Sequence, residues 1–450
     1  MGHFGIVNIM NLSSYLDPVS ITLLSRLDNP NLLGHNILIH TEEQLPDYYA
    51  AQICLVGLPE EAFVEQGFSD NGKLGASLVN SSFFMDEDPA ESQIKIGSKS
   101  SNGADNIRAE LYQLYKGQGN LVLADMGNLR PGPTAAQTAI RITQVCDMLH
   151  HAGAKVILIG PNQAATIQQV EGLCQYRDKQ EQPKALSLTV VDHQLDMDYR
   201  PSGQDEHNFL NSLFLAAEPI LFDFALLGHQ NYLSDASQLA FLDQASFVSR
   251  RLGQHRDNPQ MSELYMRQAD CISMDLGSIN GHEMRAVRDP KPFGLKGEEW
   301  CQLCWYAGHS TKLRSVGIYG YLPDEDRNGM AAKLVAVGLW HLLEGMAHSA
   351  HSQPITQYRV ASPGLEDVVF VNQSSENRWW VTQQRNNIKS LDDDALLFAC
   401  DASVYQEVLA GEVPQTLVRM MNRLSLHDKQ VRKAKKARSR TKGKPISPSE

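Results

Sequence analysis

Residues 188–196 read Leu-Thr-Val-Val-Asp-His-Gln-Leu-Asp, a short β-branched and aliphatic run that passes directly into a polar, acidic segment. Runs of the same kind recur on both sides of it. Short continuous apolar runs are typical of strands that are buried on both faces of a sheet. The further runs lie at 53–57, 121–125, 156–160, 271–275 and 315–319.

Stretches with helical periodicity separate these runs. The stretch 134–151 carries an apolar stripe at helical spacing and is followed by Gly153, and 330–346 is a second stretch of this type. Alternating strands and helices predict a mostly parallel sheet that is covered by helices on both faces. Ligands of such folds bind beyond the carboxyl ends of the strands, which is where several runs here end in Asp.

The pattern divides the chain into four parts. Residues 1–50 are predicted to be an N-terminal extension, and 51–352 the α/β domain. Residues 353–426 are predicted to be a C-terminal extension that packs on this domain, with strand-like 357–380 and short helices around Pro414. From 427 to 450 the chain is basic, lacks apolar periodicity and is predicted to be a disordered tail.

Charge is unevenly distributed along the chain. The net charge is -12, yet nine Lys or Arg lie between Lys429 and Lys444. Residues 428–450 also hold two acids, so they carry about +7 and the preceding body about -19, which does not favour nucleic acid or anionic membranes there. The tail lacks aromatic residues, so base stacking is not indicated. It is either a solvated segment or a site for polyanions or a protein partner, which would tether the body to a larger assembly. The residues proposed for such contacts are Lys433, Lys435, Lys436, Arg438 and Arg440.

Composition favours a cytoplasmic protein. The seven cysteines are scattered and odd in number, which suits buried thiols in a reducing compartment. No apolar run approaches the roughly 20 residues of a membrane helix, so no membrane insertion is expected. Residues 1–20 do not have the pattern of a signal peptide.

Ordered motifs between residues 53 and 346 resemble the ureohydrolase family of arginases, agmatinases and formimidoylglutamases. They include a first strand with a G-x-P turn, a D-x-G-D turn whose last residue is changed to Asn128, and a P-G-L-x-x-x-E loop. The final stretch around Arg378 is most similar to bacterial formimidoylglutamases. The motifs stand in the sequence as ICLVGLPE (53–60), NGA with IR (102–108), DMGN (125–128) and PFGL with Glu299 (292–299).

This resemblance implies a three-layer α/β/α fold with a mostly parallel sheet of roughly eight strands. Members of the family use two divalent ions, usually Mn²⁺, to generate a hydroxide that attacks a guanidinium or formimino carbon. They hold the ions with a His after a Gly-Gly turn, a strand-end D-x-H-x-D segment and a later D-x-D segment. Trimers or hexamers are common, so a homo-oligomer is one expectation here.

The metal-binding positions that the resemblance assigns are only partly kept in this chain. Asp192, Asp196 and Asp275 remain as carboxylates. In the family, a Glu contacts the cationic group of the substrate. The resemblance places Gly320 at that position, so the substrate-binding part of the site is changed as well. The positions of the two His and of the last Asp are occupied by Gln163, Gln194 and Gly277.

These replacements predict that a two-metal site is lost. Gln amides are weak ligands for Mn²⁺ or Zn²⁺, so no cofactor is expected and the three carboxylates are expected to be unoccupied. A single weakly held Mg²⁺ or Ca²⁺ is the alternative, because hard cations accept oxygen ligands. Without an ion, the carboxyl pKa values should rise, or a nearby cation must compensate. His193 is a candidate for that cation only if its side chain turns inward.

Three functional interpretations follow. The first is a pseudoenzyme of the ureohydrolase fold, without catalytic residues, that serves as a binding or scaffolding component of a larger assembly. The second is a metal-dependent, formimidoylglutamase-like amidinohydrolase with an unusual site, which would still use Mn²⁺. The third is a small-molecule sensor that keeps the old pocket. The sequence favours a non-enzyme with a protein partner, and nucleic acid is expected to bind only through the tail.

Overall fold

The computed structural model describes most of the chain between Leu12 and Lys442. The described residues are 12–25, 27–60, 103–117, 119–180, 186–197, 208–214, 221–349, 354–361, 368–374, 376–383, 388, 391 and 397–442, and residue 428 and the helix beyond 429 are described by their backbone.

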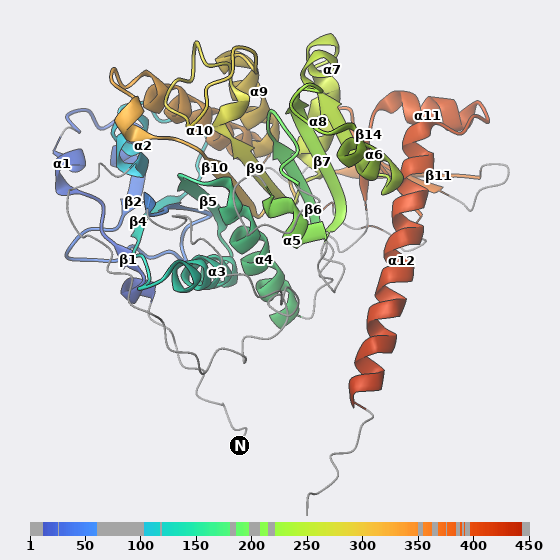
Figure 1. Cartoon of the computed structure of the whole chain (residues 1–450), viewed down its shortest axis with the longest axis horizontal. Helices are drawn as coiled ribbons and strands as arrows, with labels where there is room; N and C mark the ends of the chain where they lie inside the picture. Colours follow the sequence, from blue (N-terminus) through green and yellow to red (C-terminus); the bar gives the residue numbers. More distant parts are fainter. Residues whose placement is uncertain are drawn as a thin grey trace, which may run out of the picture.

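A ten-stranded sheet forms the centre of the body (Figure 1). Its strands run in the order β1-β4-β3-β5-β10-β9-β6-β7-β8, with β2 also paired to β4. All pairs are parallel except that of β1 with β4. The strands are β1 (Leu16–Asp17), β2 (Ile37–Ile39), β3 (Ile53–Gly57), β4 (Leu123–Leu129), β5 (Lys155–Gly160), β6 (Leu186–Val191), β7 (Leu221–His229), β8 (Val248–Arg251), β9 (Cys271–Asp275) and β10 (Ser315–Tyr319).

Helices cover both faces of this sheet because successive strand residues point to opposite sides. In β3, Ile53 and Leu55 join the core under α2, α9 and α10, whereas Cys54 and Val56 join the core under α3. The predicted α/β/α fold is therefore confirmed. The helices of the body are α1 (Ile21–Leu24), α2 (Gly103–Leu111), α3 (Ala135–His151), α4 (Thr166–Lys179), α5 (Phe209–Phe214), α6 (Ala236–Gln244), α7 (Leu252–Asp257), α8 (Gln260–Gln268), α9 (Gly297–Gly308) and α10 (Met330–Ser349).

The segment predicted as an N-terminal extension contributes β1 and β2 to the main sheet. These two short strands lie beside β4 and bring the sheet to ten strands where roughly eight were expected. Helix α10 is long and apolar enough to cross a membrane by length and composition, although no run of that kind was expected. Half of its apolar window is buried inside the fold, where it packs on α9 and α2, so it is a core helix.

The C-terminal part forms a second, antiparallel sheet in the order β11-β12-β13-β14. It attaches to the body through α8, where the Gln268 side chain bonds the backbone of Leu397 and Ala399 and Arg267 lies 4.3 Å from the ring centroid of Trp380. The strands are β11 (Ile355–Val360), β12 (Val368–Gln373), β13 (Arg378–Thr382) and β14 (Phe398–Cys400), followed by helices α11 (Ala402–Leu409) and α12 (Gln415–Lys442).

The prediction of a disordered tail from residue 427 is wrong for residues 427–442, because α12 continues as one helix to Lys442. Lys, Arg and Ala dominate this stretch, and all three have high helix propensity. The basic composition therefore did not indicate the helical backbone of this stretch. Residues 443–450 lie outside the described residues.

Candidate functional site

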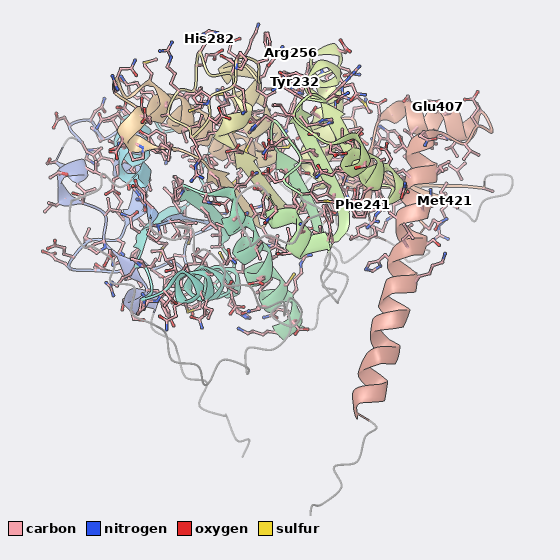
Figure 2. The ribbon with its side chains drawn as sticks, in the orientation of Figure 1. Tyr232, Phe241, Arg256, His282, Glu407 and Met421 are labelled. Carbon is pink, nitrogen blue, oxygen red and sulfur yellow. The ribbon has the colours of Figure 1, made fainter. Side chains whose placement is uncertain are left out.

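Two of the predicted carboxylates meet at the carboxyl edge of the sheet. Strands β6 and β9 are parallel neighbours in which Val191 pairs with Met274. Asp192 and Asp275 each follow one of these paired residues, so their side chains lie beside each other. Loops and short helices that follow β7, β8 and β9 form the rim of the same edge, where Tyr232, Arg256 and His282 lie (Figure 2).

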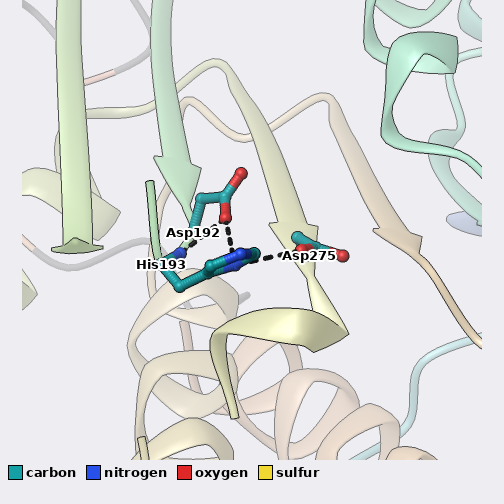
Figure 3. Close-up of side chains that lie close together, drawn as sticks. All are labelled: Asp192, His193 and Asp275. Carbon is teal, nitrogen blue, oxygen red and sulfur yellow. Dashed lines mark hydrogen bonds and ion pairs between the residues drawn. The ribbon is translucent and has the colours of Figure 1, made fainter. Parts of the chain in front are cut away.

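The side chain of His193 turns inward between these two carboxylates (Figure 3). Its Nδ1 lies 2.8 Å from Oδ1 of Asp192 and 3.6 Å from Oδ2 of Asp275. The three side chains are 12%, 1% and 18% exposed, so solvent screens the contacts little. Sequence analysis left this orientation open. The geometry places the imidazole as the counter-charge of the two carboxylates.

The inward turn is possible because β6 ends at Val191. Alternation of side chains across a strand would place His193 on the opposite side from Asp192. Beyond Val191, however, the chain forms a turn in which Oδ1 of Asp192 accepts the backbone N–H groups of His193 and Gln194. The segment after Val191 is therefore a turn and not a continuation of the strand.

The pKa shifts at the site agree with an ion pair between His193 and the two carboxylates. Burial alone lowers the pKa of His193, but the charges of Asp192 and Asp275 outweigh it and raise that pKa to about 10. Burial raises the pKa of Asp275, although the contact with His193 opposes the shift. Burial and the neighbouring Asp192 together raise the pKa of Asp196 well above its usual range. These shifts favour the protonated form of both His193 and Asp196.

The two Gln residues at the positions that the resemblance assigns to His form hydrogen bonds within the chain. Nε2 of Gln194 donates to Oδ1 of Asp196 at 2.8 Å. Nε2 of buried Gln163 donates to Oγ of Ser273 at 3.1 Å, and that hydroxyl also bonds Thr166 at 2.6 Å. Each amide nitrogen is therefore held by a partner inside the protein, and the amide oxygen is the atom through which either side chain could bind an ion, as a weak ligand for Mn²⁺.

Gly277 and Gly320 leave space that the side chains of Asp275 and His193 fill. A Cβ at Gly277 would lie 2.6 Å from Oδ2 of Asp275 and 3.3 Å from Cε1 of His193. A Cβ at Gly320 would lie 2.6 Å from Oδ1 of Asp275, and the φ of Gly320 is +92°. L side chains rarely adopt such a φ. An Asp at position 277 would require the Asp275 side chain to move, and a Glu at position 320 would require both that movement and a strained backbone.

Restoring the family residue as Gly277→Asp is expected to lower the free energy of unfolding by about 1–3 kcal/mol, because the new side chain must displace Asp275 and His193. Urea unfolding at neutral pH measures the change. The matched control is Gly253→Asp, whose Cβ would meet nothing within 4 Å, and we expect a change within about 0.5 kcal/mol. Equal stability of the two variants would show that the space at residue 277 is open.

The residues present do not fit a pair of bridged ions. Two of the positions that the resemblance assigns to His carry amides, which are weak ligands for Mn²⁺, the last position has no side chain, and burial raises the pKa of Asp196. A single ion is a different case. One donor atom each of Asp192, His193 and Asp275 lies within 4.8 Å of the others, which is close enough for one cation if the imidazole is deprotonated.

Comparison with known proteins places the fold. No family profile matches the sequence, and no curated protein sequence is similar to it. Solved structures do match. A formimidoylglutamase from Bacillus subtilis has a TM-score of 0.55 at 15% identity, over 72% of this chain and 95% of its own. A formiminoglutamase from Trypanosoma cruzi, solved with Mn²⁺, has a TM-score of 0.53 at 16% identity, over 72% of this chain and 98% of its own.

A third match is the agmatine ureohydrolase of Thermoplasma volcanium. Its TM-score is 0.50 at 17% identity, and the match covers 72% of this chain and 97% of that one. All three matches span almost the full length of the solved proteins and leave about a quarter of this chain uncovered. At these identities the likeness shows a shared fold.

Proposed function

We propose that this chain, which has the fold of the ureohydrolases, is a non-catalytic binding or scaffolding protein of the cytoplasm. The observation that carries the proposal is the position of His193. Its imidazole lies between Asp192 and Asp275, the carboxylates that the family uses for metal, and supplies positive charge from within the chain. The imidazolium then offsets one of the two carboxylate charges from within the chain, which reduces the need for a bound ion.

The chemistry of hydrolysis supports the same conclusion. Ureohydrolases need two ions to lower the pKa of a bridging water, and an ion pair between imidazolium and carboxylates does not activate water in that way. The substrate end also lacks its acidic group, because position 320 is a glycine with positive φ. Both the nucleophile and the recognition of a cationic substrate are therefore lost in this proposal.

The space near the site also favours a scaffold over a small-molecule sensor. A hollow of about 10 Å³ lies near the same edge, lined by Leu58, Glu60 and Tyr321 among others. Pockets for small molecules usually measure about 300–1,000 Å³. Among the described residues, this hollow is far smaller than the pocket that recognition of an amino acid would need.

A metal-dependent amidinohydrolase with an unusual site is the second candidate. It is favoured by the spacing of Asp192, His193 and Asp275, whose donor atoms would suit one ion. In this case His193 would be neutral and a ligand, and the bound ion would supply the Lewis acid. The two candidates therefore differ in what occupies the space between the carboxylates.

Metal content and hydrolysis separate the two candidates. We expect protein purified without chelator and then incubated with MnCl₂ and desalted to retain far less than one ion per chain. We also expect no hydrolysis of formiminoglutamate, arginine or agmatine above a blank. Elemental analysis and a coupled product assay measure these quantities. Retention of one or more ions together with turnover that Asp275→Asn abolishes would establish the second candidate instead.

A further inference from the structure

Helix α12 is firmly anchored in its first half. Leu417 and Met420 are fully buried against the second sheet. The guanidinium of Arg419 pairs with Asp223 of β7 at 3.2 Å. Arg423, which is 3% exposed, donates to the backbone carbonyls of Phe222 and Ala245 and lies 4.1 Å from the ring centroid of Phe247. These contacts fix the direction in which the helix leaves the body.

The second half of α12 runs past the edge of the body (Figure 1). At 1.5 Å per residue, the part after His427 extends about 22 Å. Between Lys429 and Lys442 it holds eight Lys or Arg and no acid, on a chain whose net charge is -12. The fold therefore carries a cationic helical arm on an otherwise acidic body.

Helical spacing sorts these charges into two groups. Five basic positions recur three or four residues apart and fall on one face of the helix. We call this face the basic stripe, and three further basic positions fall on the opposite side. The stripe consists of Lys429, Arg432, Lys433, Lys436 and Arg440, and the opposite group consists of Lys435, Arg438 and Lys442.

We propose that the basic stripe binds the phosphodiester backbone of nucleic acid. Phosphate binding requires only Lys and Arg in a row, and the release of condensed counterions drives it. A protein interface would need apolar or aromatic anchors at its centre. The arm has no aromatic residue, and Val431 is its only large apolar one. The inference is independent of the carboxylate site and of whether that site is catalytic.

Repulsion between like charges in the unbound arm also favours phosphate binding. Like charges four residues apart, such as Lys429 with Lys433 and Arg432 with Lys436, destabilise a helix by about 0.2–0.5 kcal/mol per pair. Phosphates placed along the stripe would remove this repulsion. The stripe spans about 16 Å from Lys429 to Arg440, and a duplex of that length offers about ten phosphates.

Fluorescence anisotropy with the full chain tests this inference. The probes are a labelled DNA duplex, a labelled single-stranded RNA and a labelled poly-glutamate of similar length. Five phosphate contacts predict that log K falls with log salt at a slope of about -4.5 for the duplex and about -3.5 for the single strand. Duplex affinity should then fall about 500-fold between 50 and 200 mM salt.

Two variants of equal charge test whether the stripe is the contact face. One changes Lys429, Lys433 and Lys436 to Gln, and the other changes Lys435, Arg438 and Lys442 to Gln. We expect the first to bind at least ten-fold more weakly than the second, with thermal midpoints equal to that of the wild type. Equal loss in both variants, unchanged binding, tighter binding of poly-glutamate, or salt-sensitive self-association without nucleic-acid binding would each overturn the inference.

Discussion

Replacing His193 by Gln is expected to lower the free energy of unfolding at pH 7 by about 3 kcal/mol. The amide can donate a hydrogen bond but carries no charge, so Asp192 and Asp275 lose the cation that lies between them. Removing one partner of a buried ion pair costs about 3–5 kcal/mol because the remaining charge is left without compensation. Urea unfolding followed by circular dichroism measures the change.

The same substitution should change the pH dependence of stability. The folded-state pKa of His193 is raised to about 10, against about 6.5 in the unfolded chain. The folded state therefore binds a proton more tightly, and the stability that this proton contributes is complete below about pH 6.5. It is lost as pH rises toward 10. The stability difference between wild type and His193→Gln should shrink over this range.

The control is His282→Gln, which changes an exposed histidine on the rim of the same edge. It should alter neither the stability nor its pH dependence by more than about 0.5 kcal/mol. A difference between wild type and His193→Gln that stays constant from pH 6 to pH 10 would contradict the ion pair. So would equal stability of the two proteins at pH 7.

Replacing Arg108 by Met is expected to destabilise the fold by about 3–5 kcal/mol. The guanidinium and Asp125 are both 0% exposed and form two hydrogen bonds, at 2.8 and 2.9 Å. Burial lowers the pKa of Arg108, but the charge of Asp125 outweighs it and raises that pKa, so the arginine stays charged. The variant would leave Asp125 buried with only Tyr112 and the N–H of Gly127 as donors.

A surface ion pair provides the matched control for Arg108. Arg130 contacts Asp17 with similar geometry, at 2.6 and 3.0 Å, but the two side chains are 45% and 50% exposed. Exposed pairs contribute about 0–1 kcal/mol, so Arg130→Met should have a small effect. Comparable losses in the two variants would show that burial does not decide the strength of these pairs.

Much of the fold was predictable because buried parallel strands leave an uninterrupted apolar pattern. Strands β9 and β10 begin and end at the predicted residues, and α3 lies within the predicted helical stretch 134–151, with Thr134 as its N-cap. Strand β7 was not predicted, and Asp223 lies within it. That carboxylate is satisfied by Arg419, which is 196 residues away, and such a partner is set by tertiary structure alone.

The candidate site was predictable in part. The adjacency of Asp192 and Asp275 follows from strand ends that share one edge. The role of His193 did not follow, because it depends on β6 ending at Val191 and the chain turning there. The signal that could have indicated it is charge: three carboxylates without metal require a cation, and His193 is the nearest residue in sequence that can supply one. The assignment of Asp196 as a ligand stays a prediction.

The helical backbone of the basic arm could not be predicted from its composition. Its composition resembles that of disordered segments, which also lack apolar periodicity. Two factors favour the continued helix: the helix propensity of its residues and the anchoring of Arg423. The propensity can be read from the sequence, whereas the anchoring is known only from the structure. The direction of the second half of α12 therefore follows from the anchored first half.

The central claim is that the chain's own imidazole takes the place of the bound ions. Anomalous diffraction at the manganese edge, from a crystal grown in MnCl₂ at neutral pH, tests it most directly. We predict the ring of His193 between Asp192 and Asp275 and no anomalous peak at these strand ends. Two peaks about 3.5–4 Å apart, with the ring of His193 turned away, would contradict the account.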